Sequence, residues 1–279
     1  FVWFAVAFLV ALGQYVQRPG AAPAIWAGVF AGLAYATKET AVIVLVAALV
    51  AAAVAQRWTA APGANGETAS PVTSRARAGQ TIAGLAAALA VAWVFYSSFF
   101  TYPSGLLKSF NAFGAYIERG VAPGPHVQGW DYYLRLLSFS SSGGLVWTEG
   151  LVLVLALVGI VAAFLRSSSG FWPRYGALYA LITAVAFSAI PYKTPWNALP
   201  FYAGLVVMAG VGAATLIDRA GSRLGKGLVV VALLAACGHL GVQNWRANGR
   251  YAADPRNPYV YAQTSPDFLR LVARINDVA

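Results

Sequence analysis

Charged residues are scarce in this chain, and their scarcity excludes the commonest class of protein. Asp, Glu, Lys and Arg make up 10% of the 279 residues, whereas hydrophobic residues make up 59%. The mean hydropathy is +0.64. An ordinary soluble domain carries roughly 25% charged residues. The composition therefore predicts an integral membrane protein, with room for several spans of about 20 residues each.

Residues that serve several common chemistries are also missing. Cys237 is the only cysteine, so the chain can form no intrachain disulfide, and this residue does not indicate a cellular compartment. The sequence has no Gly-rich phosphate loop and no Cys pair, and it offers no convincing Ser-His-Asp set. His126 has no second ligand at a metal-site spacing, and we interpret it as an ordinary loop histidine.

The net charge of +10 is large for so few charged residues. A basic chain can bind nucleic acid, but no basic cluster is interleaved here with a soluble fold. Anionic lipid head groups and phosphates are the natural counter-charge of a basic membrane protein. We therefore predict membrane lipids as partners and no nucleic acid.

Apolar runs predict an all-α polytopic membrane protein with seven or eight spans in residues 1–243. The runs cover roughly residues 1–16, 24–36, 41–55, 81–100, 145–165, 175–190, 196–217 and 227–243. The short runs 24–36 and 41–55 could form one tilted helix, but a Lys-Glu pair at mid-membrane would be unfavourable. We therefore expect two helices that meet at residues 37–40. We read no signal peptide before the first run, and we expect the chain to begin inside a larger protein.

The arginines and lysines of the short loops predict the orientation. They lie near Arg18, between residues 55 and 81, near Arg166 and Arg174, and between residues 217 and 227. By the positive-inside rule, these loops are cytoplasmic. Alternation then places residues 37–40, 101–144, 192–197 and the tail from 244 on the outer side of the plasma membrane.

Two outer segments differ from simple loops. Apolar residues recur at helical spacing in 101–144, which predicts amphipathic helices that lie in the membrane interface. In the tail 244–279, residues 259–263 read as a strand. Ser265, Pro266 and Asp267 then predict the start of a helix. One strand and one helix cannot bury an apolar face alone, so we expect this tail to begin an outer soluble α/β domain that is truncated here.

The strongest candidate site is the 192–197 motif, Tyr-Lys-Thr-Pro-Trp-Asn, between two apolar runs. Lys193 at a membrane boundary is unfavourable unless it meets an anion or water. Pro195 breaks the helix, and Trp196 is a typical interfacial anchor. A cation held beside an aromatic ring suits the phosphate of a lipid-linked substrate. The alternative is a lysine that merely extends its ammonium to the interface.

The 37–40 motif, Thr-Lys-Glu-Thr, is the second candidate site. Lys38 could face a phosphate, while Glu39 holds Lys38 or a divalent cation. An ion pair that closes a helical hairpin is an equal alternative, because one carboxylate is a weak metal signal. Glu149 could line the same outer cavity or simply be exposed at the interface. No other cofactor is predicted.

These two motifs, together with Asn-Pro-Tyr-Val-Tyr at 257–261, resemble the protein O-mannosyltransferase-like membrane glycosyltransferases of the GT-C fold. The resemblance is closest to their prokaryotic flippase-activity-associated branch, and it covers nearly the whole chain. It implies transfer of a sugar from a polyprenyl-phosphate donor to an acceptor on the outer face. Lys38, Glu39, Lys193 and Trp196 would then bind the donor.

The resemblance also implies a catalytic carboxylate in the first outer loop of such enzymes. This chain has no candidate for that loop, so we expect no catalytic residue and no turnover from these 279 residues alone. The alternative hypothesis is a non-enzymatic protein that handles or transports lipid-linked sugars. A secondary transporter is a third possibility, but the sequence lacks paired broken helices in equivalent halves.

Overall fold

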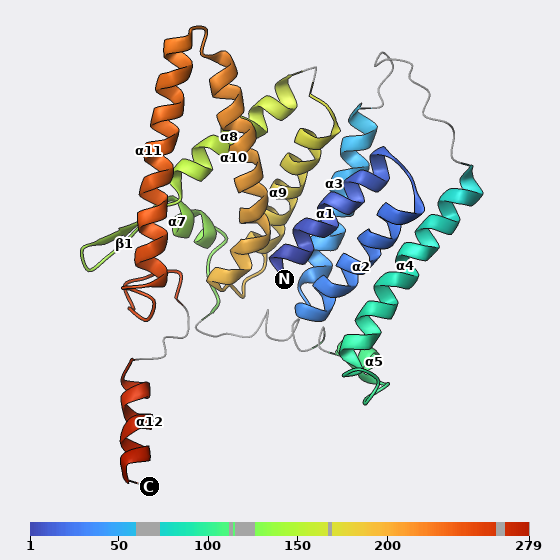
Figure 1. Ribbon diagram of the computed structural model, residues 1–279, viewed down its shortest axis with the longest axis horizontal. Helices are drawn as coiled ribbons and strands as arrows, with labels where there is room; N and C mark the ends of the chain where they lie inside the picture. The colour runs from blue at the N-terminus through green and yellow to red at the C-terminus, as the bar shows by residue number, and fades with distance from the viewer. Residues whose placement is uncertain (60–72, 112–113, 115–125, 167–168, 261–265, 279) are drawn as a thin grey trace.

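The computed structural model describes residues 1–59, 73–111, 114, 126–166, 169–260 and 266–278 (Figure 1). This part of the chain is predominantly helical, and every predicted apolar run contains a helix. The long helices are α1 (Val2–Gln17), α2 (Ala21–Thr37), α3 (Ala41–Thr59), α4 (Ser74–Tyr96), α8 (Gly150–Leu165), α9 (Phe171–Ala189), α10 (Leu199–Arg219) and α11 (Arg223–Asn248). The two short runs at 24–36 and 41–55 form two helices that meet at the 37–40 motif, as predicted.

Shorter elements connect these helices. They are α5 (Gly105–Ser109), α7 (Tyr132–Ser138), strands β1 (Ser140–Ser142) and β2 (Leu145–Trp147), the 3₁₀ turn η1 (Pro195–Ala198) and α12 (Pro266–Val278). The two strands form an antiparallel hairpin in which Ser140 pairs with Trp147. Its two-residue turn needs positive φ, which Gly143 and Gly144 supply at 51° and 80°.

The structure confirms a helical membrane protein, although it supports fewer spans than the sequence predicts. In the described residues, four segments are long and apolar enough to cross a membrane: Ala41–Thr59, Ser74–Tyr96, Pro195–Arg219 and Arg223–Asn248. Helices α1, α2 and α8 are apolar but shorter. Large apolar side chains point outward along the bundle; Leu165, for example, is 81% exposed. Such a surface is expected where lipid replaces water as the solvent.

Glycines allow two pairs of helices to approach closely. A Cβ atom on Gly28 of α2 would lie 1.9 Å from the carbonyl oxygen of Gly84 in α4. A Cβ atom on Gly212 of α10 would lie 1.9 Å from the carbonyl oxygen of Leu155 in α8. Without a hydrophobic force between helices in lipid, such small residues allow the van der Waals contact that holds them together. The sequence suggests the same packing role for Gly210, but this residue faces open space.

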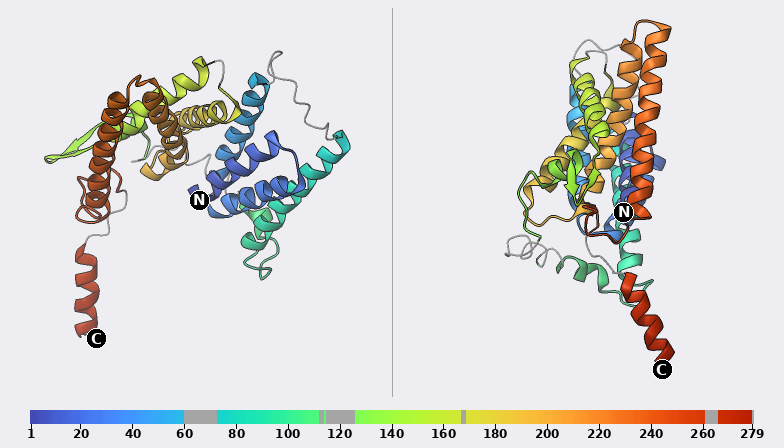
Figure 2. Two further views of the ribbon diagram at one scale, coloured as in Figure 1. Left: turned by 45° about the horizontal axis from the view of Figure 1, so that its top comes forward. Right: turned by 90° about the vertical axis from the view of Figure 1, so that its left-hand side faces the viewer.

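The helices form two groups (Figure 2). Helices α1 to α4 lie on one side and α8 to α11 on the other, and α3 packs against α9 where the groups meet. Small residues such as Ala47, Ala48 and Ala51 line the buried face of α3 at this junction. The buried residues Tyr133, Leu136 and Leu137 of α7 belong to the same core.

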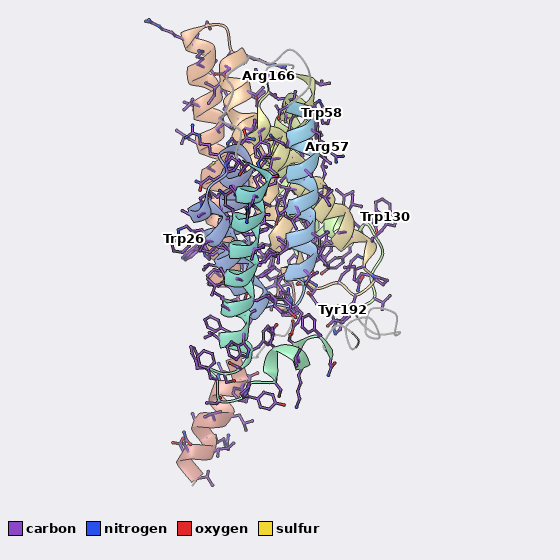
Figure 3. The ribbon with its side chains drawn as sticks, turned by 90° about the vertical axis from the view of Figure 1, so that its right-hand side faces the viewer. Trp26, Arg57, Trp58, Trp130, Arg166 and Tyr192 are labelled. Atoms are coloured by element: carbon purple, nitrogen blue, oxygen red, sulfur yellow. The ribbon has the colours of Figure 1, made fainter. Side chains whose placement is uncertain are left out.

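The connections divide between two ends of the bundle. Figure 3 shows Arg57 and Arg166 at one end and Tyr192 toward the other. The α2–α3 and α9–α10 connections lie with α5 at the end opposite the α10–α11 connection (Figure 1). This arrangement agrees with the predicted alternation. We call the end with Tyr192 the site end.

The topology can be tested by labelling single cysteines in intact cells, in a background where Cys237 is replaced by alanine. We expect Ser141→Cys, on the exposed hairpin at the site end, to react with a membrane-impermeant maleimide. Arg223→Cys, at the opposite end, should react only after the cells are permeabilised. Both side chains are exposed, so accessibility does not limit the reaction. The reverse pattern would overturn the predicted orientation.

Three details differ from the sequence predictions. The apolar face of α7 packs into the core and is not free to lie on lipid. Helix α11 continues to Asn248, past the predicted boundary at 243. Tyr259 lies in a turn and Val260 belongs to no strand, because Asn257 organises the backbone around them. The rest of the predicted strand and the predicted cap at Ser265 lie outside the described residues, whereas α12 begins at Pro266 as predicted.

Candidate functional site at the 192–197 motif

The 192–197 motif is held in place by an extended segment. Val127 and Tyr192 form an antiparallel bridge. The amide of Lys193 donates to the carbonyl of His126 at 2.9 Å, and the amide of Gln128 donates to the carbonyl of Pro191 at 3.0 Å. The chain then turns through η1, which begins at Pro195 because proline suits the first position of a helix. Backbone hydrogen bonds and the 3₁₀ turn therefore fix the course of the motif.

Lys193 is buried in this turn. The residue is only 3% exposed. Its ammonium donates to the carbonyl of Ser188 at 2.7 Å and also to the carbonyl of Ile190. These carbonyls lie at the C-terminal end of α9, where the backbone lacks partners of its own. Burial lowers the pKa of Lys193, and the charge of Asp131 raises it. In this structure Lys193 caps α9, which neither of the interpretations from the sequence included.

Lys38 connects the two motifs. It is half-buried at the end of α2, and its ammonium donates to Oδ1 of Asn197 at 2.6 Å, across 159 residues of sequence. It also lies 5.8 Å from the centre of the Phe1 ring. In the described part of the chain Lys38 forms no ion pair, so the predicted pair with Glu39 is not present. Burial lowers the pKa of Lys38, and the nearby charge of Glu39 raises it.

Tyr133 packs against the 192–197 motif. Its ring centre lies 5.9 Å from the ammonium of Lys193. Its hydroxyl donates to the carbonyl of Thr194 at 3.2 Å. Burial raises the pKa of this tyrosine, so its hydroxyl stays protonated as a donor. We call Lys38, Tyr133, Lys193 and Asn197 the lysine cluster.

Two hydroxyl groups in these motifs are buried without a partner. They belong to Thr40 and Thr194, one from each motif, and neither Oγ1 atom has a hydrogen-bond partner in the described part of the chain. Thr194 is only 1% exposed. Buried polar groups are almost always paired, so an unpaired one requires an explanation such as an absent ion or ligand. Both motifs thus retain hydrogen-bonding capacity.

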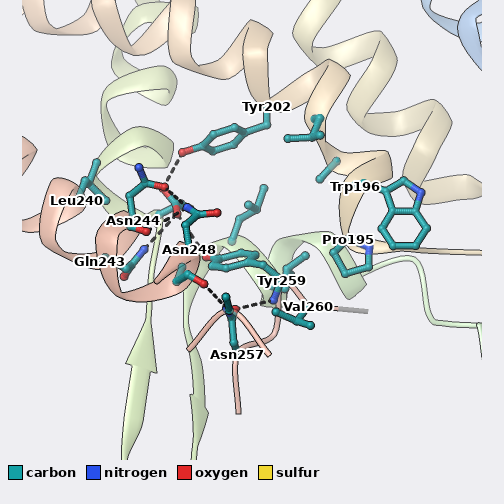
Figure 4. A pocket seen from close by; sticks show the side chains of 17 residues that line it. Pro195, Trp196, Tyr202, Leu240, Gln243, Asn244, Asn248, Asn257, Tyr259 and Val260 are labelled. Carbon is teal, nitrogen blue, oxygen red and sulfur yellow. Dashed lines mark hydrogen bonds between the residues drawn. The ribbon is translucent and has the colours of Figure 1, made fainter. Parts of the chain in front are cut away.

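A cavity of about 520 Å³ lies on the other side of η1 (Figure 4). Pro195 and Trp196 line it, and Trp196 is 42% exposed. Lys38, Glu39 and Lys193 are not among its lining residues. Of the four predicted site residues, the structure therefore links Lys38 to the turn that carries Lys193 and places Trp196 in the cavity.

Glu149 is the only charged residue among those that line this cavity. Its Oε2 atom accepts a hydrogen bond from the hydroxyl of Tyr202 at 2.6 Å. Its Oε1 atom accepts from Nε2 of Gln243 at 3.1 Å and from the hydroxyl of Tyr259 at 3.3 Å. The three donors come from α10, from α11 and from the segment after α11. We call this space the Glu149 cavity.

Gln243 fixes the carboxylate in place. It is 7% exposed, and its Oε1 atom accepts from the amide of Thr148 at 2.9 Å. Asn257, at 2% exposure, orders the next segment by donating to the carbonyls of Ala247 and Tyr251. Sequence reasoning missed Gln243 and Tyr202. The available signal was a glutamine at the end of the apolar run 227–243, because a polar side chain at membrane depth usually faces a cavity or another helix.

The comparisons do not identify a relative. No protein family, curated protein or solved structure matches this chain. In the described residues, no group of three His, Cys, Asp or Glu side chains could hold a metal ion. The predicted divalent cation at Glu39 therefore stays a prediction, as does the resemblance to the GT-C enzymes.

Proposed function

We propose that this chain is part of a membrane glycosyltransferase that uses a polyprenyl-phosphate sugar as donor, and that the lysine cluster binds the donor phosphate. The observation that carries the proposal is the hydrogen bond from Lys38 to Asn197, which unites the two motifs at the site end. A lysine that only reached for the interface would have no reason to bind the turn that carries the second lysine.

The chemistry of the lysine cluster suits a phosphate monoester or diester at a membrane surface. Lys38 has one strong hydrogen bond to a neutral amide and no ion pair within the described residues, so its charge is available to an anion. Hydrogen bonds between an ammonium and a phosphate are short and about twice as strong as neutral ones. The unpaired hydroxyls of Thr40 and Thr194 could donate to further phosphate oxygens. Lys193 adds positive charge from a buried position.

Replacing Lys38 tests this proposal. We expect Lys38→Met to weaken the binding of a polyprenyl phosphate by about 10- to 100-fold, because a charged hydrogen bond contributes about 1.5–3 kcal/mol. The measurement is an equilibrium binding titration with the intact protein in nanodiscs. Lys108→Met is the matched control, because Lys108 lies on α5, also at the site end, and donates to the hydroxyl of Tyr102. This control should bind like the wild type.

The enzymatic part of the proposal needs a second measurement. Transfer of sugar from the polyprenyl-phosphate donor should be detectable with the full-length protein and should fall in parallel with donor binding in Lys38→Met. Binding without any transfer would favour the alternative, a protein that handles lipid-linked sugars without catalysis. Unchanged affinity in Lys38→Met would remove the lysine cluster from the proposal.

A further inference from the structure

The Glu149 cavity has the chemistry of a site for a hydroxyl-rich ring. One wall carries amide side chains from α11, and the opposite wall carries an aromatic ring from η1. Figure 4 shows Gln243, Asn244 and Asn248 grouped near Tyr202 and Tyr259, with Pro195 and Trp196 facing them from the other side. Ligand sites commonly combine an apolar surface with a few polar groups that set the orientation.

The carboxylate of Glu149 retains capacity for a ligand. A carboxylate offers about four acceptor positions. Three are used by Tyr202, Gln243 and Tyr259, which leaves one position on Oε2. The two tyrosine hydroxyls donate to Glu149, so their oxygen lone pairs can accept from a ligand. The cavity thus presents a group of acceptors whose positions are fixed by packing.

These acceptors discriminate between the possible occupants. A metal ion would need several anionic ligands, and no such group exists among the described residues. A phosphate would be repelled by Glu149, which forms no ion pair within the described part of the chain. Neutral hydroxyl groups can donate to the carboxylate and also accept from the side-chain amide of Asn244, whereas both N–H groups of the Asn248 side chain already donate to Asn244. The apolar face of a pyranose ring can pack against the indole of Trp196.

The Glu149 cavity and the lysine cluster share one turn of the chain. Trp196 lines the cavity, and Asn197 binds Lys38. These residues are consecutive, so their Cα atoms are about 3.8 Å apart. One turn of η1 therefore separates a cationic site from a hydroxyl-binding site. In a glycosyl phosphate, a single oxygen atom joins the sugar ring to the phosphate, so one donor would contact both sites by passing around η1.

We propose that the Glu149 cavity binds the sugar ring of the lipid-linked donor, with Glu149 accepting hydrogen bonds from its hydroxyls and Trp196 packing against its face. This inference rests on the proposed function, because it assumes that the phosphate of the same donor lies at the lysine cluster. In this proposal, Glu149 makes the protein prefer a lipid phosphate that carries a sugar over one that does not. Lys38 provides the affinity for the phosphate itself.

The test compares two ligands with the intact protein in nanodiscs: a polyprenyl phosphate and the same lipid carrying a hexose. The wild type should bind the hexosyl lipid at least about tenfold more tightly, which corresponds to one or two good hydrogen bonds. Glu149→Gln removes the charge but preserves the shape, and it should lose this preference while keeping its affinity for the polyprenyl phosphate. Asp267→Asn, an exposed carboxylate on α12, is the matched control and should keep the preference.

The outcomes separate this inference from the proposed function. If the wild type binds both lipids equally, or if Glu149→Gln keeps the preference, the sugar site is wrong although the phosphate site stands. If the wild type binds neither lipid, both proposals fail. If Glu149→Gln lowers the unfolding midpoint, Trp196→Ala decides instead, because its partly exposed ring can be removed without opening the core. A retained preference in Trp196→Ala would then overturn the sugar site.

Discussion

Gly212→Leu should prevent the bundle from packing, with a loss of about 3 kcal/mol or more in the free energy of unfolding. Its first added atom would lie 1.9 Å from the carbonyl oxygen of Leu155 and 3.0 Å from the amide nitrogen of Gly159. Both are backbone atoms of α8, which cannot rotate away as a side chain can. Helices α8 and α10 would have to separate, and the contacts made by their small residues would be lost.

Gly210→Leu is the matched control for this experiment. It lies in the same helix, two residues earlier, and a Cβ atom there would meet nothing within 4 Å. We expect its stability to stay within about 0.5 kcal/mol of the wild type. Unfolding in detergent micelles by added SDS, followed by tryptophan fluorescence, measures both variants. Equal stability of the two variants would contradict the close approach of α8 and α10.

Lys193→Met should be the most damaging single change at the site end. The ammonium donates to the carbonyls of Ser188 and Ile190, and the residue is 3% exposed, so water cannot easily replace it. Two buried acceptors left without a donor correspond to a loss of about 2–4 kcal/mol. Lys193→Arg should recover only part of the stability, because a planar guanidinium does not fit a space shaped by an ammonium.

For the proposed glycosyltransferase, the transfer activity of the full-length protein should fall further than stability does in these Lys193 variants. The end of α9 leads directly into η1, so a displaced turn would move Asn197 away from Lys38. We expect Lys193→Ala to reduce sugar transfer strongly even at temperatures where the protein stays folded. Lys226→Met replaces an exposed lysine at the start of α11 and serves as the control. If Lys193→Met had the stability and turnover of the wild type, the hydrogen bonds from Lys193 to the end of α9 would contribute little to either property.

The positions of the helices follow largely from the sequence. An apolar run prefers lipid to water, proline disfavours a helix interior, and the Lys-Glu pair at 38–39 disfavours the middle of a membrane. Each of these preferences depends only on the solvent and on residues nearby in the sequence. This is why the division into two helices at the 37–40 motif and the break between two apolar runs at the 192–197 motif were predictable. The ends of α8 and α11 were less predictable. Residues 145–147 form a strand that the apolar pattern does not distinguish from the start of a helix.

The candidate site depends on contacts between distant residues. Lys38 and Asn197 are 159 residues apart, and Glu149 and Gln243 are 94 residues apart. No local sequence pattern predicts that these side chains are in contact, because the contact depends on how α2, η1, α8 and α11 pack. The direction of the Lys193 side chain could not be predicted from the sequence either, since an ammonium between two spans can face a ligand or the carbonyls of the preceding helix.

The sequence by itself determined that this protein is helical, apolar enough for a membrane, and broken by two lysine-containing turns. Only the tertiary structure decided that Lys38 reaches the second turn, that Lys193 caps α9, and that a separate cavity surrounds Glu149. The physical reason is that hydrophobicity and backbone preferences act residue by residue. Cavities and shared hydrogen bonds arise only where several helices end side by side.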